Sequence, residues 1–159
     1  MSTAYLLIGG NLGNRKENLL TAISLINEQC GSLTKSSSIY ETEAWGKTDQ
    51  PSFLNQALEI STSLNARQLM RKILKIEKEM GRIREEKLGP RIIDVDILLF
   101  DNEIHDLRFL KIPHPEMQNR RFVLVPIAEI DPTLQHPILK KTIAELLEEC
   151  PDNLEVRKI

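Results

Sequence analysis

The chain has 159 residues, of which 41% are hydrophobic and 28% are charged. These values are ordinary for a soluble globular protein and allow one domain with its own core. The formal net charge of −2 excludes a global basic field, so non-specific binding to nucleic acid or to a membrane surface is not expected. Any anionic ligand must therefore be held by a local cluster of basic residues.

Cysteine usage and the N-terminus indicate a cytoplasmic protein. Cys30 and Cys150 match no disulfide framework, metal site or redox motif, so both are expected as small buried thiols. The start, MSTAYLLIGG, has no basic region and too short an apolar run for a signal peptide. No stretch approaches the roughly 18–20 apolar residues of a membrane helix. We expect one domain over residues 1–159 that acts as a monomer, because the predicted helices leave no apolar stripe uncovered.

The periodicity of apolar residues predicts alternating strands and helices. In chain order they are a strand at 4–8, a helix at 15–29 capped by Asn14, a weak strand at 33–42, a loop at 41–52, a strand at 53–62, a helix from Asn65 to Gly81, a charged loop at 81–91, a strand at 92–100, a turn at 101–103 that could open a hairpin, a short helix at 126–130 and a last helix capped by Thr142 and Glu145. The order strand–helix–strand–strand–helix–strand predicts a ferredoxin-like βαββαβ core, an α+β fold with an antiparallel sheet and helices packed on it.

Helical spacing also predicts the side chains of the second helix that face the core. They are Leu69, Ile73, Leu74, Ile76 and Met80. Fold class alone does not define a function, so the function has to come from the site residues.

Two aspartates stand at the entrance of the strand in the stretch GPRIIDVDILLF. Side chains two apart in a strand point the same way, so Asp94 and Asp96 share a face, on which Leu98 and Phe100 are also expected. Beyond Asp96 both faces are apolar, which predicts a central strand buried on both sides. Two carboxylates at this spacing suit Mg²⁺ together with phosphate oxygens. The alternative is a pair of edge aspartates that bind Arg91 or nearby amides.

Basic residues gather in two segments near these aspartates. They are Arg82, Arg84, Lys87 and Arg91 in the charged loop, and Arg120 and Arg121 further along. Planar guanidinium groups suit phosphate oxygens, and a triphosphate needs several such partners. The alternative is a solvated loop whose charges pair with Glu85 and Glu86. His114, between two prolines, could donate to a phosphate, bind a metal or cap a turn.

Few aromatic residues occur in the sequence, and two of them, together with an asparagine, form a candidate site for a flat ring compound. Phe53 and Asn55 share one strand face, and Phe122 follows the second pair of arginines. Two phenylalanines could sandwich a flat heterocycle, with plain core packing as the alternative. The turn IGGNLGN at 8–14 matches neither phosphate-binding glycine motif and is expected to allow close approach of a ligand or a neighbouring loop.

Together these segments resemble the 6-hydroxymethyl-7,8-dihydropterin pyrophosphokinase family of folate biosynthesis. The matching segments are AYLLIGGNLGN, FLNQALEIST, IEKEMGRIR, LGPRIIDVDILLF and IPHPEMQNRRFVLVP, which follow the family's order from about Ala4 to Pro132. The resemblance implies transfer of a pyrophosphoryl group from ATP, the co-substrate, to the hydroxymethyl group of a reduced pterin, with AMP as the second product. It also implies a ferredoxin-like α+β domain with mobile catalytic loops and two Mg²⁺ ions.

The resemblance carries the family's site residues onto this chain. It implies that Asp94 and Asp96 hold the metal ions and act in catalysis with Arg82 and Arg91. The ATP contacts that it implies are Glu77, Arg82, Arg84, Arg91, Ile97, His114 and Arg120. The pterin contacts that it implies are Thr42, Ala44, Trp45, Phe53, Asn55, Asp94 and Phe122, with the two phenylalanines stacking on the ring and Asn55 bonding to its edge. Leu88 stands where many members have an aromatic residue, so closure of the loop at 81–91 is expected to differ.

Two other classes of function compete with this interpretation. A ferredoxin-like RNA-binding module needs exposed aromatics and a basic sheet face, and the sequence offers neither. A Mg²⁺-dependent nuclease or phosphatase shares the two carboxylates but needs a base that activates water. Phosphoryl transfer needs positioning and charge stabilisation rather than a protein nucleophile, which agrees with the lack of a nucleophile triad in the sequence.

Overall fold

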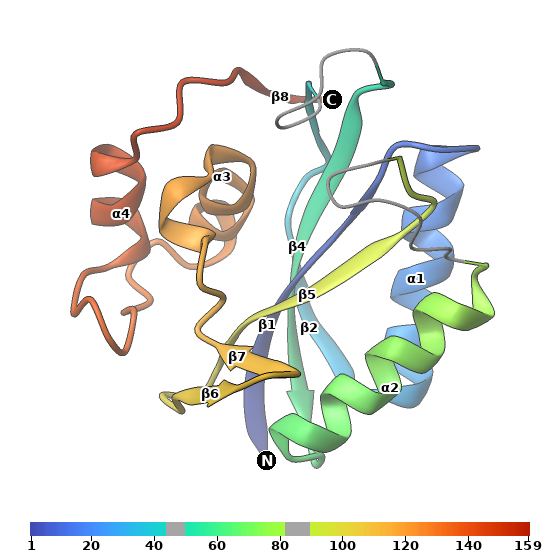
Figure 1. Ribbon diagram of the computed structural model, residues 1–159, viewed down its shortest axis with the longest axis horizontal. Coiled ribbons are helices and arrows are strands. Elements are labelled where there is room, and N and C mark those ends of the chain that lie inside the picture. Colours follow the sequence, from blue (N-terminus) through green and yellow to red (C-terminus); the bar gives the residue numbers. More distant parts are fainter. Residues whose placement is uncertain (44–49, 82–89) are drawn as a thin grey trace.

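A computed structural model of the protein describes residues 1–43, 50–81 and 90–159 (Figure 1). The elements are β1 (Ser2–Gly10), α1 (Arg15–Gln29), β2 (Ser32–Ser36), β3 (Tyr40–Thr42), β4 (Phe53–Thr62), α2 (Ala66–Glu79), β5 (Asp94–Phe100), β6 (His105–Leu107), β7 (Leu110–Ile112), the 3-10 helix η1 (Met117–Asn119), α3 (Arg121–Ile130), α4 (Ile143–Glu149) and β8 (Val156–Lys158). In these residues no helix is long and apolar enough to cross a membrane.

The main sheet is antiparallel, with β1 between β4 and β5. The strands β2 and β3 both pair with β4, and β8 adds an edge beyond β3. Figure 1 shows α1 and α2 on one side of the sheet and α3 and α4 on the other. This arrangement confirms the predicted ferredoxin-like α+β class, and the predicted bounds of the first helix match α1.

Each face of the sheet has its own hydrophobic core, because alternate residues of β1 point to opposite faces. Leu6 packs with residues of α1 and α2. Leu7 packs with residues of α3 and α4. The second face is the one on which the candidate site lies, since Leu7 is also part of the pocket described below.

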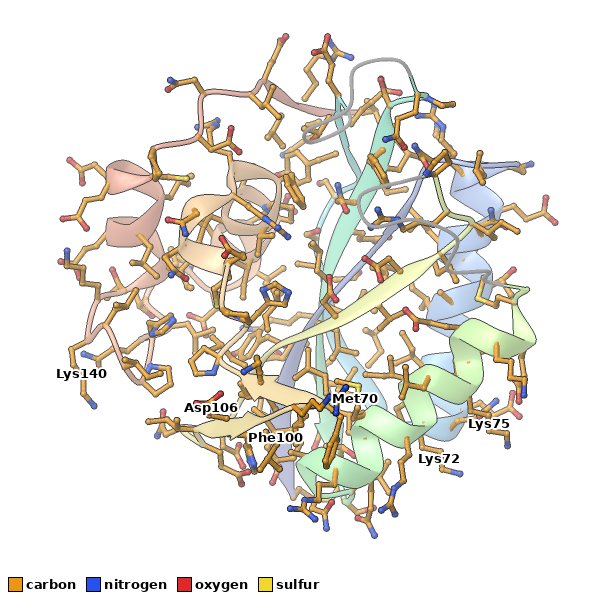
Figure 2. All side chains as sticks on the ribbon, viewed as in Figure 1. Met70, Lys72, Lys75, Phe100, Asp106 and Lys140 are labelled. Carbon is orange, nitrogen blue, oxygen red and sulfur yellow. The ribbon has the colours of Figure 1, made fainter. Side chains whose placement is uncertain are left out.

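The strand that carries the aspartates is an edge strand of the sheet, so the predicted central position is wrong. Its apolar half is still buried, as expected. The pairing of β5 with β1 shifts by one residue at Leu98. Such a β-bulge interrupts the alternation of side chains between the two faces of the sheet. Leu99 therefore joins Leu98 in the core below α3, while Phe100 packs in the other core, near Met70 of α2 (Figure 2). The expectation that Phe100 shares a face with Asp96 is wrong for this reason.

Two details of the helices also differ from the predictions. Leu74 is exposed, whereas Glu77 on the same helix is buried. The helix predicted at 126–130 begins at Arg121, with Pro126 in its interior. Pro126 therefore lies inside the helix rather than at its first position, where proline is most common, and it cannot donate the backbone hydrogen bond of an ordinary interior residue. The turn at 101–103 does lead to a hairpin, formed by β6 and β7.

Both cysteines are free, and only Cys30 is fully buried.

Two tyrosine–carboxylate hydrogen bonds connect the C-terminal end of helix α3 to the sheet. The hydroxyl of Tyr5 on β1 donates to Asp131 Oδ2 at 3.0 Å. The hydroxyl of Tyr40 on β3 donates to Glu129 Oε1. Glu129 Oε2 also accepts from the Ser38 N–H at 2.9 Å. This end of α3 is therefore fixed independently of the end that enters the site.

Stability should fall on mild acidification because His136 is buried and His114 is partly buried. His136 is 4% exposed, and its Nδ1 accepts from the N–H groups of Ile138 and Leu139 at 3.2 and 3.1 Å. Burial lowers the pKa of His136, and burial together with Arg120 lowers that of His114, from the ordinary 6.5. The unfolded chain takes up these protons near pH 6.5 and the folded chain only at lower pH, so the free energy of unfolding decreases as the pH falls below that value.

The measurement is urea unfolding at about pH 7.5 and about pH 5.5, which bracket the ordinary histidine pKa. His136→Asn keeps a neutral acceptor and removes the titration, so it should flatten the pH dependence. An unchanged pH dependence in that variant would contradict the assignment.

Candidate active site

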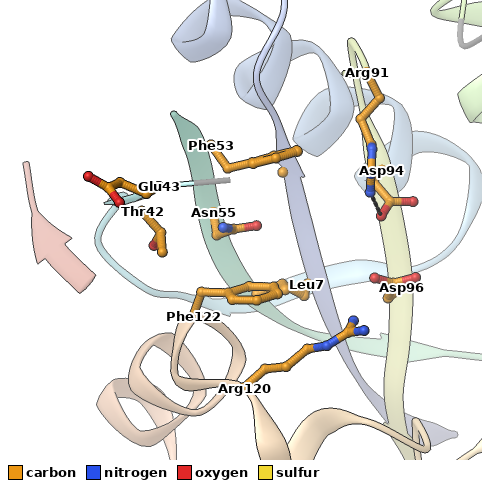
Figure 3. Close-up of a pocket in the computed structure, with 11 residues that line it drawn as sticks. Leu7, Thr42, Glu43, Phe53, Asn55, Arg91, Asp94, Asp96, Arg120 and Phe122 are labelled. Carbon is orange, nitrogen blue, oxygen red and sulfur yellow. Dashed lines mark hydrogen bonds and ion pairs between the residues drawn. The ribbon is translucent and has the colours of Figure 1, made fainter. Parts of the chain in front are cut away.

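A pocket opens on the α3 side of the sheet, between β1, β4 and β5 and the start of α3 (Figure 3). It is lined by Leu7, Gly9, Thr42, Glu43, Phe53, Asn55, Arg91, Asp94, Asp96, Arg120 and Phe122. The pocket joins carboxylates and guanidinium groups to an aromatic region. Eight of the eleven residues that line it were among the predicted site residues. The remaining three are Leu7, Gly9 and Glu43.

The aromatic region consists of Phe53 on β4 and Phe122 on α3. Figure 3 shows the two rings edge-on, one above and one below the Asn55 side chain, which points between them. We call this space the aromatic slot. Thr42, 2% exposed, lines the same pocket, and its hydroxyl oxygen is buried without a hydrogen-bond partner in the described part of the chain. A buried polar atom of this kind normally has a hydrogen-bond partner, so Thr42 is a candidate contact for a ligand in the pocket.

Two glycines at the end of β1 allow neighbouring segments to approach this strand closely, as predicted for the turn at 8–14. A Cβ on Gly9 would lie 2.2 Å from Asn55 Oδ1 and 2.7 Å from the Leu54 carbonyl oxygen. A Cβ on Gly10 would lie 2.2 Å from the Ile92 carbonyl oxygen. Both glycines therefore allow β1 to approach its neighbours at the pocket edge. The glycine pair itself was the sequence signal, although the sequence did not assign Gly9 to the site.

Gly9→Ala should displace the Asn55 amide, because the new methyl group would overlap its oxygen. We expect the affinity for a ligand in the aromatic slot to fall by about tenfold, the cost of one or two misaligned hydrogen bonds. Calorimetric titration would measure it, with thermal unfolding recorded separately for the strain against Leu54. Unchanged affinity would contradict a role for the Asn55 amide in binding.

Arg91 links the aromatic slot to the aspartates. Its guanidinium lies 5.1 Å from the centroid of the Phe53 ring, and its Nη1 is 3.2 Å from Asp94 Oδ2. The backbone of Arg91 is fixed by buried Asn11, whose Oδ1 accepts from the Arg91 N–H at 2.9 Å. The Asn11 amide also donates to the Pro51 carbonyl oxygen at 2.9 Å. Asn11 therefore ties together the described ends of the two predicted loops.

Asp94 and Asp96 both point into the pocket from β5, one above the other (Figure 3). The ion pair of Arg91 with Asp94 is the contact that the alternative interpretation of the aspartates predicted. Glu77 supports the strand between them, because its Oε2 accepts from the Val95 N–H at 2.8 Å. Glu77 is 3% exposed and does not line the pocket. The spacing of the two carboxylates is therefore held by a rigid, buried contact.

Arg120 enters the pocket from the opposite side, below Phe122. Its guanidinium lies 5.8 Å from the Phe122 ring centroid, and Figure 3 shows it directed towards Asp96. His114 is near enough to Arg120 and Asp94 for both charges to affect its pKa, which burial lowers most. Its Nδ1 accepts from the Glu116 N–H at 3.2 Å, so the neutral ring carries its proton on Nε2. His114 itself does not line the pocket.

The other predicted site residues are placed differently. Arg82, Arg84, Ala44 and Trp45 lie outside the described residues, as do Lys87 and Leu88. Ile97 is buried in the core below α1 and α2, on the far face of the sheet from the pocket. Arg121 is directed to the C-terminal segment, where its Nε donates to the Leu154 carbonyl oxygen at 3.3 Å.

The pocket places paired carboxylates and guanidinium groups beside an aromatic slot, an arrangement that suits a transferase acting on phosphate groups and a flat ring compound. The chain belongs to the 7,8-dihydro-6-hydroxymethylpterin-pyrophosphokinase (HPPK) family, whose model matches residues 5–132. This confirms the family resemblance of the sequence, and it makes the chain an enzyme of the pyrophosphokinase class.

Named relatives support the same family. The chain is 43% identical over 149 residues to the 2-amino-4-hydroxy-6-hydroxymethyldihydropteridine pyrophosphokinase of Aquifex aeolicus, covering 94% of this chain and 92% of that protein. It is 48% identical over 128 residues to the Bacillus subtilis protein of the same name, covering 80% of this chain and 77% of that one.

A solved structure has the same fold. A Plasmodium falciparum HPPK-DHPS protein superimposes with a TM-score of 0.76 at 18% identity, over 93% of this chain. The chain spans only 43% of that longer protein. This likeness therefore supports the fold and not the details of the site.

Proposed function

We propose that the pocket of Figure 3 is where the chain carries out its family's reaction. That reaction transfers the pyrophosphoryl group of ATP to the hydroxymethyl group of hydroxymethyldihydropterin, in folate biosynthesis. The observation that carries the proposal is the direct contact between the two halves of the pocket: Arg91 touches both the Phe53 ring and the Asp94 carboxylate. A pterin in the aromatic slot would thus have its substituent beside the phosphate-binding groups.

The aromatic slot suits a pterin. Its two rings supply stacking surface, and the Asn55 amide between them can donate and accept at the edge of a heterocycle. The buried Thr42 hydroxyl adds a third polar contact. We infer that Phe53, Phe122, Asn55 and Thr42 bind the pterin, with Ala44 and Trp45 as further candidates from the sequence.

The aspartates suit Mg²⁺ ions that accompany ATP. Their donors are all carboxylate oxygens, which Mg²⁺ prefers. Without a cation, these charges would repel a triphosphate. Within residues 1–43, 50–81 and 90–159, no group of three or more His, Cys, Asp or Glu side chains forms a metal site. This agrees with an ion that takes one or two carboxylates and completes its shell with phosphate oxygens and water. We propose that Asp94 and Asp96 hold two such ions.

Bound magnesium would neutralise the triphosphate and lower the barrier for attack at phosphorus. The chain's own groups position the reactants. Arg91 and Arg120 reach the pocket from opposite sides and can both bind phosphate oxygens. His114, neutral and protonated on Nε2, can donate a hydrogen bond to a phosphate. Arg82, Arg84 and Glu77 remain proposed ATP contacts on the strength of the sequence.

The reaction is an in-line displacement at the β-phosphorus. The hydroxymethyl oxygen of the pterin forms the new bond to this phosphorus, and its proton is released to water. The bond between the β-phosphorus and the oxygen bridging to the α-phosphorus breaks, and AMP leaves with that oxygen. The pterin oxygen is the nucleophile, so the proposed reaction needs positioning and charge stabilisation from the protein rather than a covalent intermediate on it.

We propose that the enzyme acts as a monomer, because the helices expected from the sequence leave no apolar stripe uncovered. We also propose a cytoplasmic location, since the number and spacing of the cysteines in the sequence match no disulfide framework.

The test is AMP formation from ATP and Mg²⁺ with and without hydroxymethyldihydropterin. We expect AMP and the pterin diphosphate in equal amounts, and no AMP above background when the pterin is omitted. Release of ADP or inorganic phosphate in place of AMP would indicate a phosphatase or a simple kinase and would contradict the proposal.

A further inference from the structure

The segment that follows α4 passes over the start of α3 before it reaches β8 (Figure 1). Asp152 lies in this segment and is 7% exposed. Its two carboxylate oxygens have separate partners. Oδ2 accepts from the N–H of Arg121 at 3.0 Å, and Oδ1 accepts from the N–H of Leu154 at 3.0 Å. Asp152 therefore joins the C-terminal segment to the first residue of α3.

The contact acts as a helix cap supplied from a distant part of the chain. The residue before α3 is Arg120, whose guanidinium only donates hydrogen bonds and so cannot accept from the first N–H groups of the helix. A carboxylate at this place both accepts such a bond and interacts favourably with the helix dipole. The cap is reinforced by Arg121, whose Nε donates to the Leu154 carbonyl oxygen at 3.3 Å.

The capped residue stands between two residues of the pocket. Arg120 precedes Arg121 and Phe122 follows it, and both line the pocket. The peptide N–H held by Asp152 belongs to the bond that joins Arg120 to Arg121, so this contact determines where the two flanking side chains leave the backbone. The other end of α3 is fixed by Tyr5 and Tyr40. The start of the helix has its own anchor in Asp152.

We propose that Asp152 is a positioning residue for the reaction: by capping α3 it aligns Phe122 with the pterin and Arg120 with the phosphates. This inference rests on the proposed function. It assigns a role in substrate binding to the C-terminal segment, outside the part of the chain that the family model matches.

The first experiment compares Asp152→Ala, Asp152→Asn and the matched surface variant Asp106→Asn in the full chain. Asp106 lies on the exposed β6–β7 hairpin, where it pairs with Lys111, and it does not line the pocket (Figure 2). Titration with hydroxymethyldihydropterin, in the presence of Mg²⁺ and an ATP analogue with a methylene bridge between the α- and β-phosphates, gives the pterin affinity. We expect about a tenfold loss for Asp152→Ala, a smaller loss for Asp152→Asn, which keeps one acceptor oxygen, and no change for Asp106→Asn.

The second experiment separates positioning from general stability. In a Phe122→Ala background, Asp152→Ala should have little further effect on pterin affinity, because the ring that it aligns is gone. In an Asn55→Ala background, its effect should persist. A lower melting temperature with unchanged pterin affinity, or an equal effect in both backgrounds, would overturn the inference. If Asp152→Ala does not fold, Asp152→Asn decides by the same comparison. Absence of pterin binding by the unaltered protein would instead contradict the proposed function.

Discussion

Asp96→Ala is expected to lower the rate of AMP formation by about a thousandfold or more while leaving the fold intact. The side chain points into the pocket from β5, whose backbone is paired with β1, so its removal deletes the proposed metal-binding carboxylate and little packing. Loss of one preorganised charge-stabilising group typically costs a factor of about 100 to 1,000, and loss of a metal contact adds to it. A thousandfold change corresponds to about 4 kcal/mol in the activation free energy.

The measurement is the initial rate of AMP formation at saturating ATP and pterin over a series of Mg²⁺ concentrations. Asp106→Ala is the matched control, since that aspartate lies on the exposed hairpin. The circular dichroism spectrum should be unchanged in both variants. Near-normal turnover of Asp96→Ala at ordinary Mg²⁺ concentrations would contradict the assignment of Asp96 to the metal.

Removal of the two rings of the aromatic slot is expected to have the second largest effect. Stacking of a base on an aromatic side chain is worth about 1–3 kcal/mol, so Phe53→Ala and Phe122→Ala should each weaken pterin binding by about 5- to 150-fold. The double variant should lose more than either single variant. ATP affinity should change much less, because the phosphate-binding groups of the pocket remain.

Calorimetric titration with pterin and with ATP separately would distinguish the two effects. Leu7→Ala is a useful comparison, because it also enlarges the pocket but removes no ring. If Leu7→Ala weakened pterin binding as much as Phe122→Ala, the effect would be one of packing rather than stacking. An equal loss of ATP affinity in the phenylalanine variants would likewise argue against a slot that is specific for the pterin.

The fold was largely predictable because its signals are local. The caps at Asn14, Asn65 and Thr142 mark the starts of three helices, and all three are present with the expected side-chain hydrogen bonds. The apolar pattern identified the strand on either side of α2, as residues that share a face before the helix and as a continuous apolar run after it. The strands β6, β7 and β8 have three residues each. Such short segments carry almost no periodic signal, and β8 was missed for that reason.

The interruption in β5 shows what local pattern cannot supply. Strict alternation assigned Phe100 to the face of Asp96, but the bulge at Leu98 reverses the last residues of the strand. A bulge depends on how two strands pair, and pairing is not a property of either segment alone. The exposed Leu74 and the buried Glu77 are a similar case. Glu77 is buried because the Val95 N–H, 18 residues away, needs an acceptor.

The pocket was predictable where residue types have distinctive chemistry. Paired aspartates, arginines and scarce aromatics stand out in a sequence, and the structure brings Asp94, Asp96, Arg91, Arg120 and the two phenylalanines together. Residues that act through geometry do not stand out. Gly9 belongs to the pocket because its lack of a Cβ leaves room for the Asn55 side chain. Asp152 reaches the first residue of α3 because the C-terminal segment passes back over that helix.

A crystal structure of the protein with hydroxymethyldihydropterin, Mg²⁺ and the methylene-bridged ATP analogue tests the central claim most directly. We predict the pterin ring between Phe53 and Phe122, with its edge on Asn55, and metal ions coordinated by Asp94 and Asp96. The hydroxymethyl oxygen should face the β-phosphorus in line with the bridging atom. A pterin bound elsewhere, or a triphosphate whose metal ions do not contact these aspartates, would contradict the proposal.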